Sequence, residues 1–261
     1  MEQVALIILA AGKGTRMKSG RAKVLHELIG VPMIRYVVQT ALAVVSDVVV
    51  VIGHQAEAVR NALCDFPCLR FAVQREQLGT GHAVLTAMPL IADTVRDAVI
   101  LCGDTPLIKT QTIEALIKEH RARQVDLTLA TTRLAEPFGY GRIICDVRGR
   151  VRRIVEQTDA SPEEKKIDTV NTGTYCVKAA LLRRLLPDLR DNNAQNEFYL
   201  TDVVEKAYQE GTPGAVVEVA NSLEVLGINT MDELGRAEKS LRDMVDHSAQ
   251  FSLDSLPSGC L

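Results

Sequence analysis

The beginning of the chain constrains its fold more than any other stretch, because an apolar run leads there directly into a glycine-rich basic turn. The run covers residues 6–11 and the turn residues 12–17. An apolar run of this kind is typical of a strand buried in a parallel sheet. Its glycines let the backbone approach an anion, and Lys13, Arg16 and Lys23 add positive charge nearby. The stretch therefore predicts a loop that binds the phosphates of a nucleotide.

Two familiar glycine motifs do not fit this turn. A Walker A loop needs four residues between its first glycine and the Gly-Lys-Ser/Thr, and this turn is too compressed. The dinucleotide fingerprint needs a small residue where Met17 stands, and its second strand ends in an acidic residue, whereas here the second strand ends in His54. A glycine turn after a strand can also be purely structural, so other residues must decide.

Composition and charge narrow the class of protein. The chain has 261 residues, of which 47% are hydrophobic and 24% charged, with a net charge of −3. Such a charge argues against nucleic-acid binding, because no global positive field would attract a polyanion. No apolar run approaches the roughly twenty residues of a membrane span, and the first residues lack the basic start of a signal peptide. We expect a cytoplasmic protein with no membrane contact.

The six cysteines are spread through the chain. Only Cys64 and Cys68 lie close together, and neither a histidine nor a second cysteine pair follows at metal-ligand spacing. We therefore expect free thiols.

Strand-like and helix-like segments alternate through the first half of the chain. Strands are expected at 4–10, 47–52, 69–73, 98–102 and 126–132, and helices at 32–43, 56–63, 80–88 and 110–123. This alternation predicts an α/β fold with an open, mostly parallel sheet and helices on both faces. Ligands of such sheets bind beyond the carboxyl ends of the strands, where Gly12, Gln74 and Asp104 would lie.

The pattern changes after residue 135. Strands at 143–146 and 151–155 form a hairpin that we interpret as a lid, and strands at 170–177 and 215–220 alternate with helices at 178–186 and 199–209. A charged helix at 231–246 precedes a frayed tail that begins near His247. We therefore divide the chain into a domain at 1–230 and a linker-like helix and tail at 231–261.

Two further stretches carry candidate chemistry. A buried strand delivers Asp104 to the sheet edge, where a carboxylate can hold Mg²⁺, although a turn or helix-cap aspartate would look the same. Gln74 stands before the turn Gly79-Thr80-Gly81, and its amide offers the donor and acceptor that suit a pyrimidine edge. His82 follows this turn and is interpreted as a structural residue at a helix start.

Ordered motifs lie at 9–17, 23–26, 77–83, 138–143, 154–156, 170–173, 192–202 and 227–229. These motifs make the chain similar to the sugar-nucleotide pyrophosphorylases, and within them to the N-acetylglucosamine-1-phosphate uridylyltransferases. The latter form the first half of bifunctional enzymes that make UDP-N-acetylglucosamine, a peptidoglycan precursor. The resemblance covers residues 4 to about 230 and implies a Rossmann-like nucleotidyltransferase fold.

The resemblance also implies a role for each matching residue. The nucleotide and its phosphates would be held by Leu9, Ala10, Ala11, Gly12, Lys13 and Lys23, with Arg16 over the β- and γ-phosphates. Uracil would be read by Gln74, Gly79 and Thr80. Mg²⁺ would be coordinated by Asp104 and Asn229, and the amino sugar would be bound by Gly141, Glu156, Asn171, Tyr199 and Thr201. Arg16, Lys23 and Asp104 would be the catalytic residues.

Without the resemblance, several of these residues have simpler interpretations. Glu156 would be one partner of a surface ion pair, and Asn171 and Asn229 would be turn residues. The reaction itself fits the inventory, since the phosphate of a sugar 1-phosphate is largely ionised near neutral pH and needs no general base. The protein must supply in-line positioning and neutralisation of charge.

The chain departs from the family in three ways. Alanine occupies position 22, where proline is frequent, and we expect it to loosen the approach of Lys23. Cys102 stands where a tyrosine is common. No hexapeptide repeats follow residue 229, so we expect no acetyltransferase activity and a monomer or weak oligomer. A separate acetyltransferase partner stays open.

Two other functions stay open at this point. The chain could be a pyrophosphorylase for another pair of substrates, such as glucose-1-phosphate with UTP or dTTP. It could also be a non-catalytic sensor of nucleotide sugars, although a sensor could lose its metal ligands, and Asp104 and Asn229 are retained.

Overall fold

Nine strands form the main sheet of the computed structural model, which describes residues 2–254. These strands are β1 (Val4–Ala10), β4 (Val48–Ile52), β5 (Arg70–Val73), β6 (Asp97–Cys102), β7 (Leu127–Arg133), β8 (Arg142–Cys145), β9 (Val151–Val155), β10 (Thr169–Lys178) and β11 (Ala215–Glu218). A separate short hairpin pairs β2 (Glu27–Leu28) with β3 (Val31–Pro32). The helices are α1 (Met33–Val44), α2 (Ala56–Ala62), α3 (Thr80–Ala87), α4 (Thr110–Arg123), α5 (Ala179–Leu185), α6 (Asp202–Gln209) and α7 (Met231–Asp254).

The sheet is mixed but mostly parallel, as the sequence predicted. Its central order is β11-β7-β10-β6-β1-β4-β5. All of these neighbours pair in parallel except β10, which runs antiparallel to both β6 and β7. The carboxyl ends of β1, β5 and β6 therefore meet at one edge, and the loops that follow them lie together.

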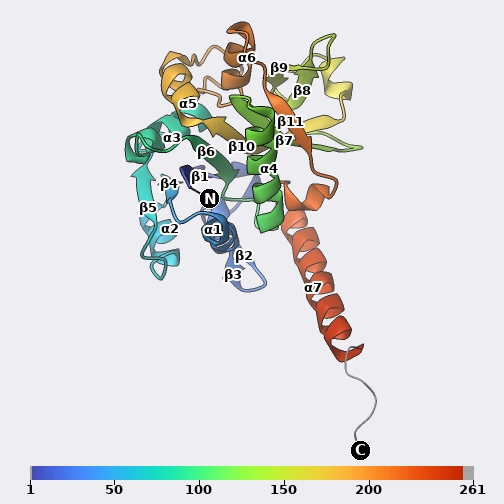
Figure 1. Ribbon diagram of the computed structural model, residues 1–261. Coiled ribbons are helices and arrows are strands. Elements are labelled where there is room, and N and C mark those ends of the chain that lie inside the picture. Colours follow the sequence, from blue (N-terminus) through green and yellow to red (C-terminus); the bar gives the residue numbers. More distant parts are fainter. Residues whose placement is uncertain (1, 255–261) are drawn as a thin grey trace, which may run out of the picture.

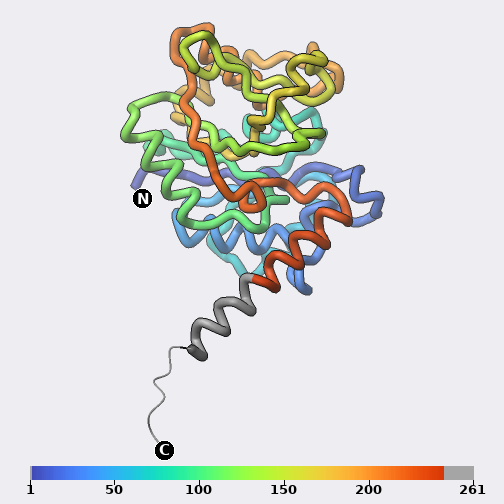
Figure 2. Tube along the Cα trace, turned by 90° about the vertical axis from the view of Figure 1, so that its right-hand side faces the viewer, coloured from blue at the N-terminus to red at the C-terminus, as the bar shows by residue number. Residues whose placement is uncertain are grey.

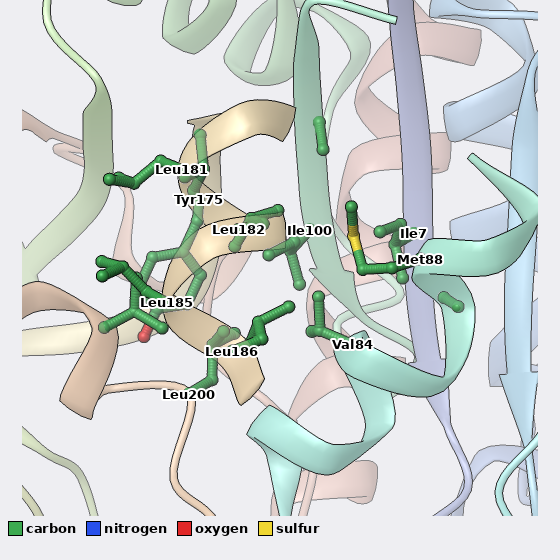
Figure 3. Packing of buried hydrophobic residues seen from close by; sticks show 14 of the residues in the cluster. Ile7, Val84, Met88, Ile100, Tyr175, Leu181, Leu182, Leu185, Leu186 and Leu200 are labelled. Carbon is green, nitrogen blue, oxygen red and sulfur yellow. The ribbon is translucent and has the colours of Figure 1, made fainter. Parts of the chain in front are cut away.

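Helices cover both faces of the sheet (Figure 1). Along β1, Ile7 faces the side covered by α3, α5 and α6, whereas Leu6 and Ile8 face the side covered by α1, α2 and α4. Figure 3 shows the first of these cores, where Leu182 of α5 and Val84 of α3 pack around Ile100 of β6. Burying each such side chain contributes about 1.5–3 kcal/mol, which fixes the sheet beneath the site.

The predicted hairpin is present as β8 and β9. It extends the sheet through β10, where Arg142 pairs with Val170, and α6 packs against β9. The hairpin thus lies beside the carboxyl end of β6 and borders that edge of the sheet. Helix α7 leaves the body of the fold on another side (Figure 2), and its first turns are anchored by Leu234 and Ala237 in a small apolar cluster with Met17.

Three element boundaries differ from the sequence predictions by two residues or more. The segment 199–201 is a turn and α6 begins at Asp202, because the N–H of Leu200 donates to the Thr80 hydroxyl at 3.0 Å. Strand β11 ends at Glu218. Helix α7 continues to Asp254 past the expected tail, while residues 255–261 lie outside the described part.

Two expectations about the whole chain can be compared with the described residues. None of the helices found between residues 2 and 254 is long and apolar enough to cross a membrane. The cysteines in this range are free thiols, namely Cys64, Cys68, Cys102, Cys145 and Cys176. Cys260 lies outside it.

Candidate active site

The loop after β1 depends on a glycine in the left-handed region. Gly14 has φ +66°, and a Cβ at this position would lie 2.4 Å from the Cβ of Lys23. Any side chain here would therefore be strained and would displace the lysine. The loop and Lys23 are placed against each other by this close approach.

Ala22, which precedes this lysine, is fully buried and hydrogen-bonded. Its N–H donates to the Gln55 Oε1 at 2.8 Å, and the Gln55 amide donates in turn to the carbonyl of Gly20 at 2.7 Å. A proline has no N–H and could not make the first bond. The expected loosening is therefore offset by a contact that alanine allows.

Shortening the Gln55 side chain tests whether this contact positions Lys23. Gln55→Asn tolerates the positive φ of 54° at this residue but withdraws the amide from Ala22. We expect a loss of about 1 kcal/mol in the free energy of unfolding, and a several-fold rise in the KM for the nucleotide. Urea unfolding and steady-state kinetics measure the two effects. An unchanged KM would show that Lys23 does not depend on this contact.

A cluster of four polar side chains forms where the ends of β1 and β6 meet the loop before α7. The ammonium of Lys23 pairs with the Asp104 carboxylate and donates to the Asn229 Oδ1 at 2.9 Å. Arg16 donates to the same Asn229 oxygen at 2.7 Å. Asn229 is held by its own Nδ2, which donates to the Gly227 carbonyl at 2.8 Å. The side-chain oxygens of Asp104 and Asn229 thus converge on the ammonium group of Lys23.

This donor set fits Mg²⁺. The ion prefers one or two carboxylate or carbonyl ligands together with phosphate oxygens and water, and Asp104 and Asn229 supply one oxygen each at a single point. No group of three or more His, Cys, Asp or Glu in the part that the structure describes could hold a metal ion. An ion bound here would therefore take its other ligands from substrate and water.

A cavity of about 450 Å³ lies over the loop after β1. Lys23 and Asp104 line it, and so do all the residues that the family resemblance assigned to the nucleotide except Arg16. These are Leu9, Ala10, Ala11, Gly12, Lys13, Gln74, Gly79 and Thr80. At Gly79 the φ is +111°, and a Cβ would lie 2.6 Å from the carbonyl oxygen of Phe198. This glycine is therefore required by the close approach of the segment before α6.

A second cavity of about 260 Å³ lies between the hairpin and the first part of β10. Its lining includes Gly141, Glu156, Asn171 and Thr201, which the sequence assigned to a sugar. Leu9, Lys23, Thr80, Cys102 and Asp104 line both cavities. The two cavities therefore meet at the Lys23–Asp104 pair.

The geometry of β10 aims Asn171 into the second cavity. The register of β10 against β7 shifts between Asn171 and Tyr175, which marks a bulge. The Asn171 Oδ1 accepts from the Tyr175 hydroxyl at 3.0 Å and from the Gly173 N–H at 3.1 Å. Because its oxygen is occupied in this way, Asn171 has its NH₂ group left to donate to a ligand.

Burial controls the ionisation of two side chains in this region. Burial, together with the nearby carboxylates of Asp159 and Asp202, raises the pKa of Glu156. Burial also raises the pKa of the Cys102 thiol to about 12, with the Asp104 charge adding to the effect. Cys102 therefore stays neutral and packs against Gly173, where an added Cβ would lie 2.6 Å from its sulfur.

Two assigned residues lie elsewhere than the sequence suggested. Tyr199 lines neither of these two cavities; its hydroxyl bonds to the Gln195 Oε1 at 2.8 Å and it lines a separate cavity beside Glu156. Arg16 lines the second cavity and not the first, so it lies beside the residues assigned to the sugar and not beside those assigned to the nucleotide. Their assigned roles stay predictions.

Sequence reasoning missed Gln55 and Tyr175. Each acts through another residue, Gln55 through Ala22 and Tyr175 through Asn171. No local pattern signals such a contact, since Gln55 lies 33 positions from Ala22.

Comparison with known proteins gives consistent matches. Residues 6–169 match the model of the MobA-like NTP transferase domain. A protein of Desulfotalea psychrophila named bifunctional protein GlmU is 48% identical over 240 residues, which are 92% of this chain and 70% of the relative. Proteins of the same name from Pelobacter propionicus and Bacillus subtilis are 46% and 42% identical over 98% and 94% of this chain. The chain spans 56% and 54% of their lengths.

A solved structure shares the fold. It is described as a putative glucose-1-phosphate thymidylyltransferase from Bacillus anthracis, and it superposes with a TM-score of 0.74. The match covers 92% of this chain and 96% of the other, at 20% sequence identity. This confirms the nucleotidyltransferase fold that the sequence predicted.

Proposed function

The chain belongs to the family of MobA-like NTP transferase domains, and on that premise we propose that it is a uridylyltransferase that makes UDP-N-acetylglucosamine and pyrophosphate from UTP and N-acetylglucosamine-1-phosphate. The observation that carries the proposal is the meeting of two cavities at the Lys23–Asp104 pair. The relatives named GlmU support uridylyl transfer.

We assign one substrate to each of the two cavities. The larger cavity would hold UTP, with its phosphates beside Lys13 and Lys23. The smaller cavity would hold the sugar phosphate, with Glu156 and Asn171 at the sugar and Arg16 toward its phosphate. An oxygen of the sugar phosphate would then attack the α-phosphorus of UTP in line, and pyrophosphate would leave.

The side chains at the junction supply charge and not proton transfer. The attacking phosphate oxygen is already largely ionised near neutral pH, because the second pKa of a phosphate monoester is about 6. Lys23 and Arg16 bring two positive charges to the junction and hold the reacting phosphates in place. Mg²⁺, which we propose binds at Asp104 and Asn229, would neutralise phosphate charge when bound.

The proposal includes the setting in which such an enzyme works. UTP and sugar phosphates are cytoplasmic metabolites, so we propose a cytoplasmic enzyme with small-molecule substrates. The relatives are longer than this chain, and the sequence-based prediction of a monomer or weak oligomer stays a prediction. A mass measurement in solution tests it.

The release of pyrophosphate tests the function directly. With Mg²⁺ present, UTP and dTTP are each combined with N-acetylglucosamine-1-phosphate, glucose-1-phosphate and glucosamine-1-phosphate. We expect the highest kcat/KM with UTP and N-acetylglucosamine-1-phosphate. Preference for another pair would overturn the sugar or base assignment, and binding of UTP without release from any pair would indicate a sensor.

A further inference from the structure

Gln74 stands at the end of β5 with its backbone fixed on both sides. Its N–H donates to the Ile52 carbonyl at 2.8 Å, and its carbonyl accepts from the Gln77 amide at 3.1 Å. The residue is 3% exposed, yet it lines the larger cavity. A buried amide in this place presents a single polar group to the cavity, and which group it presents depends on its rotation.

Two contacts fix that rotation. The Gln74 Nε2 lies 3.0 Å from the carbonyl oxygen of Gly79 and 3.0 Å from the Nδ1 of His82. A carbonyl oxygen can only accept, so the atom that faces it must be the NH₂ nitrogen. The second amide hydrogen then points at the His82 Nδ1, which must be the accepting nitrogen of a neutral ring protonated at Nε2.

The carbonyl oxygen of the Gln74 side chain is left for the cavity. None of the described residues forms a hydrogen bond to the Gln74 Oε1. A ligand edge that meets Gln74 therefore meets an acceptor without a competing donor. Uracil carries a donor at N3, whereas cytosine carries an acceptor at the same position, so the two bases differ in sign at the atom that this oxygen would contact.

We propose that His82 is a positioning residue that holds the Gln74 amide with its oxygen toward the base, and that it thereby selects uracil over cytosine. The inference rests on the proposed function, because it assumes that the larger cavity binds the base of a nucleotide. Loss of the acceptor at position 82 leaves one buried amide hydrogen unpaired. Only the Gly79 carbonyl then holds the amide, so its oxygen is fixed less firmly toward the cavity and the preference for the N3 donor of uracil over the N3 acceptor of cytosine weakens.

This proposed role differs from the structural interpretation of His82 that the sequence suggested. Packing at a helix start would need only the size and shape of the ring, and it would not distinguish one nucleobase from another. The base preference of position 82 variants therefore separates the two roles.

The test measures UTP and CTP affinity by calorimetry in the His82→Leu and His82→Asn variants. Leucine removes the acceptor, whereas asparagine can place its Oδ1 near the position of the lost Nδ1. We expect His82→Leu to weaken UTP binding about 10-fold and to reduce the UTP-to-CTP preference by a similar factor, and His82→Asn to restore it. Equal weakening for both nucleotides, or no rescue by asparagine, would overturn the inference.

Tyr175→Phe serves as the matched control, because it removes a hydrogen bond to the Asn171 amide in the other cavity. We expect it to leave the UTP-to-CTP preference unchanged. Thermal unfolding checks that each variant folds.

A measurement on the unmodified chain is independent of any variant. The ¹⁵N chemical shifts of the His82 ring should show the tautomer with the proton on Nε2. A proton on Nδ1 would overturn the inference. Because neither binding nor tautomer requires turnover, failure of the pyrophosphate assay would count against the proposed function alone.

Discussion

Replacing Asp104 with asparagine is expected to lower the rate of pyrophosphate release about 10²- to 10³-fold. The carboxylate is 13% exposed, pairs with Lys23, and is the single anionic group among the side chains of the Arg16–Lys23–Asn229 cluster. Asparagine keeps the size and one oxygen but leaves two cations without a counter-charge. The Mg²⁺ concentration that gives half the maximal rate should rise at the same time, because an amide oxygen attracts the ion less than a carboxylate does.

Asp126→Asn provides the matched control for this change. It also breaks an aspartate–lysine pair, with Lys178, but at the opposite end of β10 from Asn171. We expect its kinetics to equal those of the unmodified chain. Full activity of Asp104→Asn at ordinary Mg²⁺ concentrations would contradict the proposed role of Asp104, whereas loss of activity in both variants would point to an unfolded protein.

The fold was predictable because its strands are long and apolar enough to be identified from their own residues, without knowledge of the strands that they pair with. Residues 4–10 and 98–102 are apolar runs that must be buried on both faces, and they pair in parallel as β1 and β6. The antiparallel direction of β10 was not predictable, since its apolar pattern does not depend on direction. The end of α6 nearest the site was also missed, because hydrogen bonding to Thr80 outweighs helix propensity at 199–201.

The candidate site also has features that the sequence could predict and features that it could not. The grouping of the motif glycines and charged residues at one edge of the sheet could be predicted from the sequence, because these residues follow the carboxyl ends of parallel strands. The direction of an amide could not be assigned, because it is set by contacts such as those of Tyr175 with Asn171 and of His82 with Gln74. Gln74 offers an acceptor to one cavity and Asn171 a donor to the other. The polar group that each amide presents to its cavity therefore depends on a neighbouring side chain.

Replacing Glu156 with glutamine is expected to weaken the binding of the sugar phosphate while it stabilises the free protein. Burial raises the pKa of Glu156, with Asp159 and Asp202 adding to the effect, so the ionised carboxylate is unfavourable in the empty cavity. A ligand that donates hydrogen bonds to it repays that cost. We expect the KM for N-acetylglucosamine-1-phosphate to rise about 10- to 100-fold and the KM for UTP to stay unchanged.

The stability change should depend on pH in a defined direction. Because the pKa is higher in the folded than in the unfolded chain, the unmodified protein loses stability as the pH rises from the ordinary glutamate value through the raised one. Glu156→Gln lacks this loss, so its advantage in the free energy of unfolding should be present at pH 8 and should shrink as the pH falls through the same window.

Urea unfolding at several pH values measures this dependence. Glu218→Gln, which changes an exposed carboxylate paired with Arg133, serves as the control and should show neither effect. A Glu156→Gln variant that is less stable than the unmodified chain at pH 8 would mean that the carboxylate is compensated within the empty cavity. In that case only a rise in the KM for the sugar phosphate would support a binding role for Glu156, because a carboxylate that the protein already stabilises is stabilised less by the sugar.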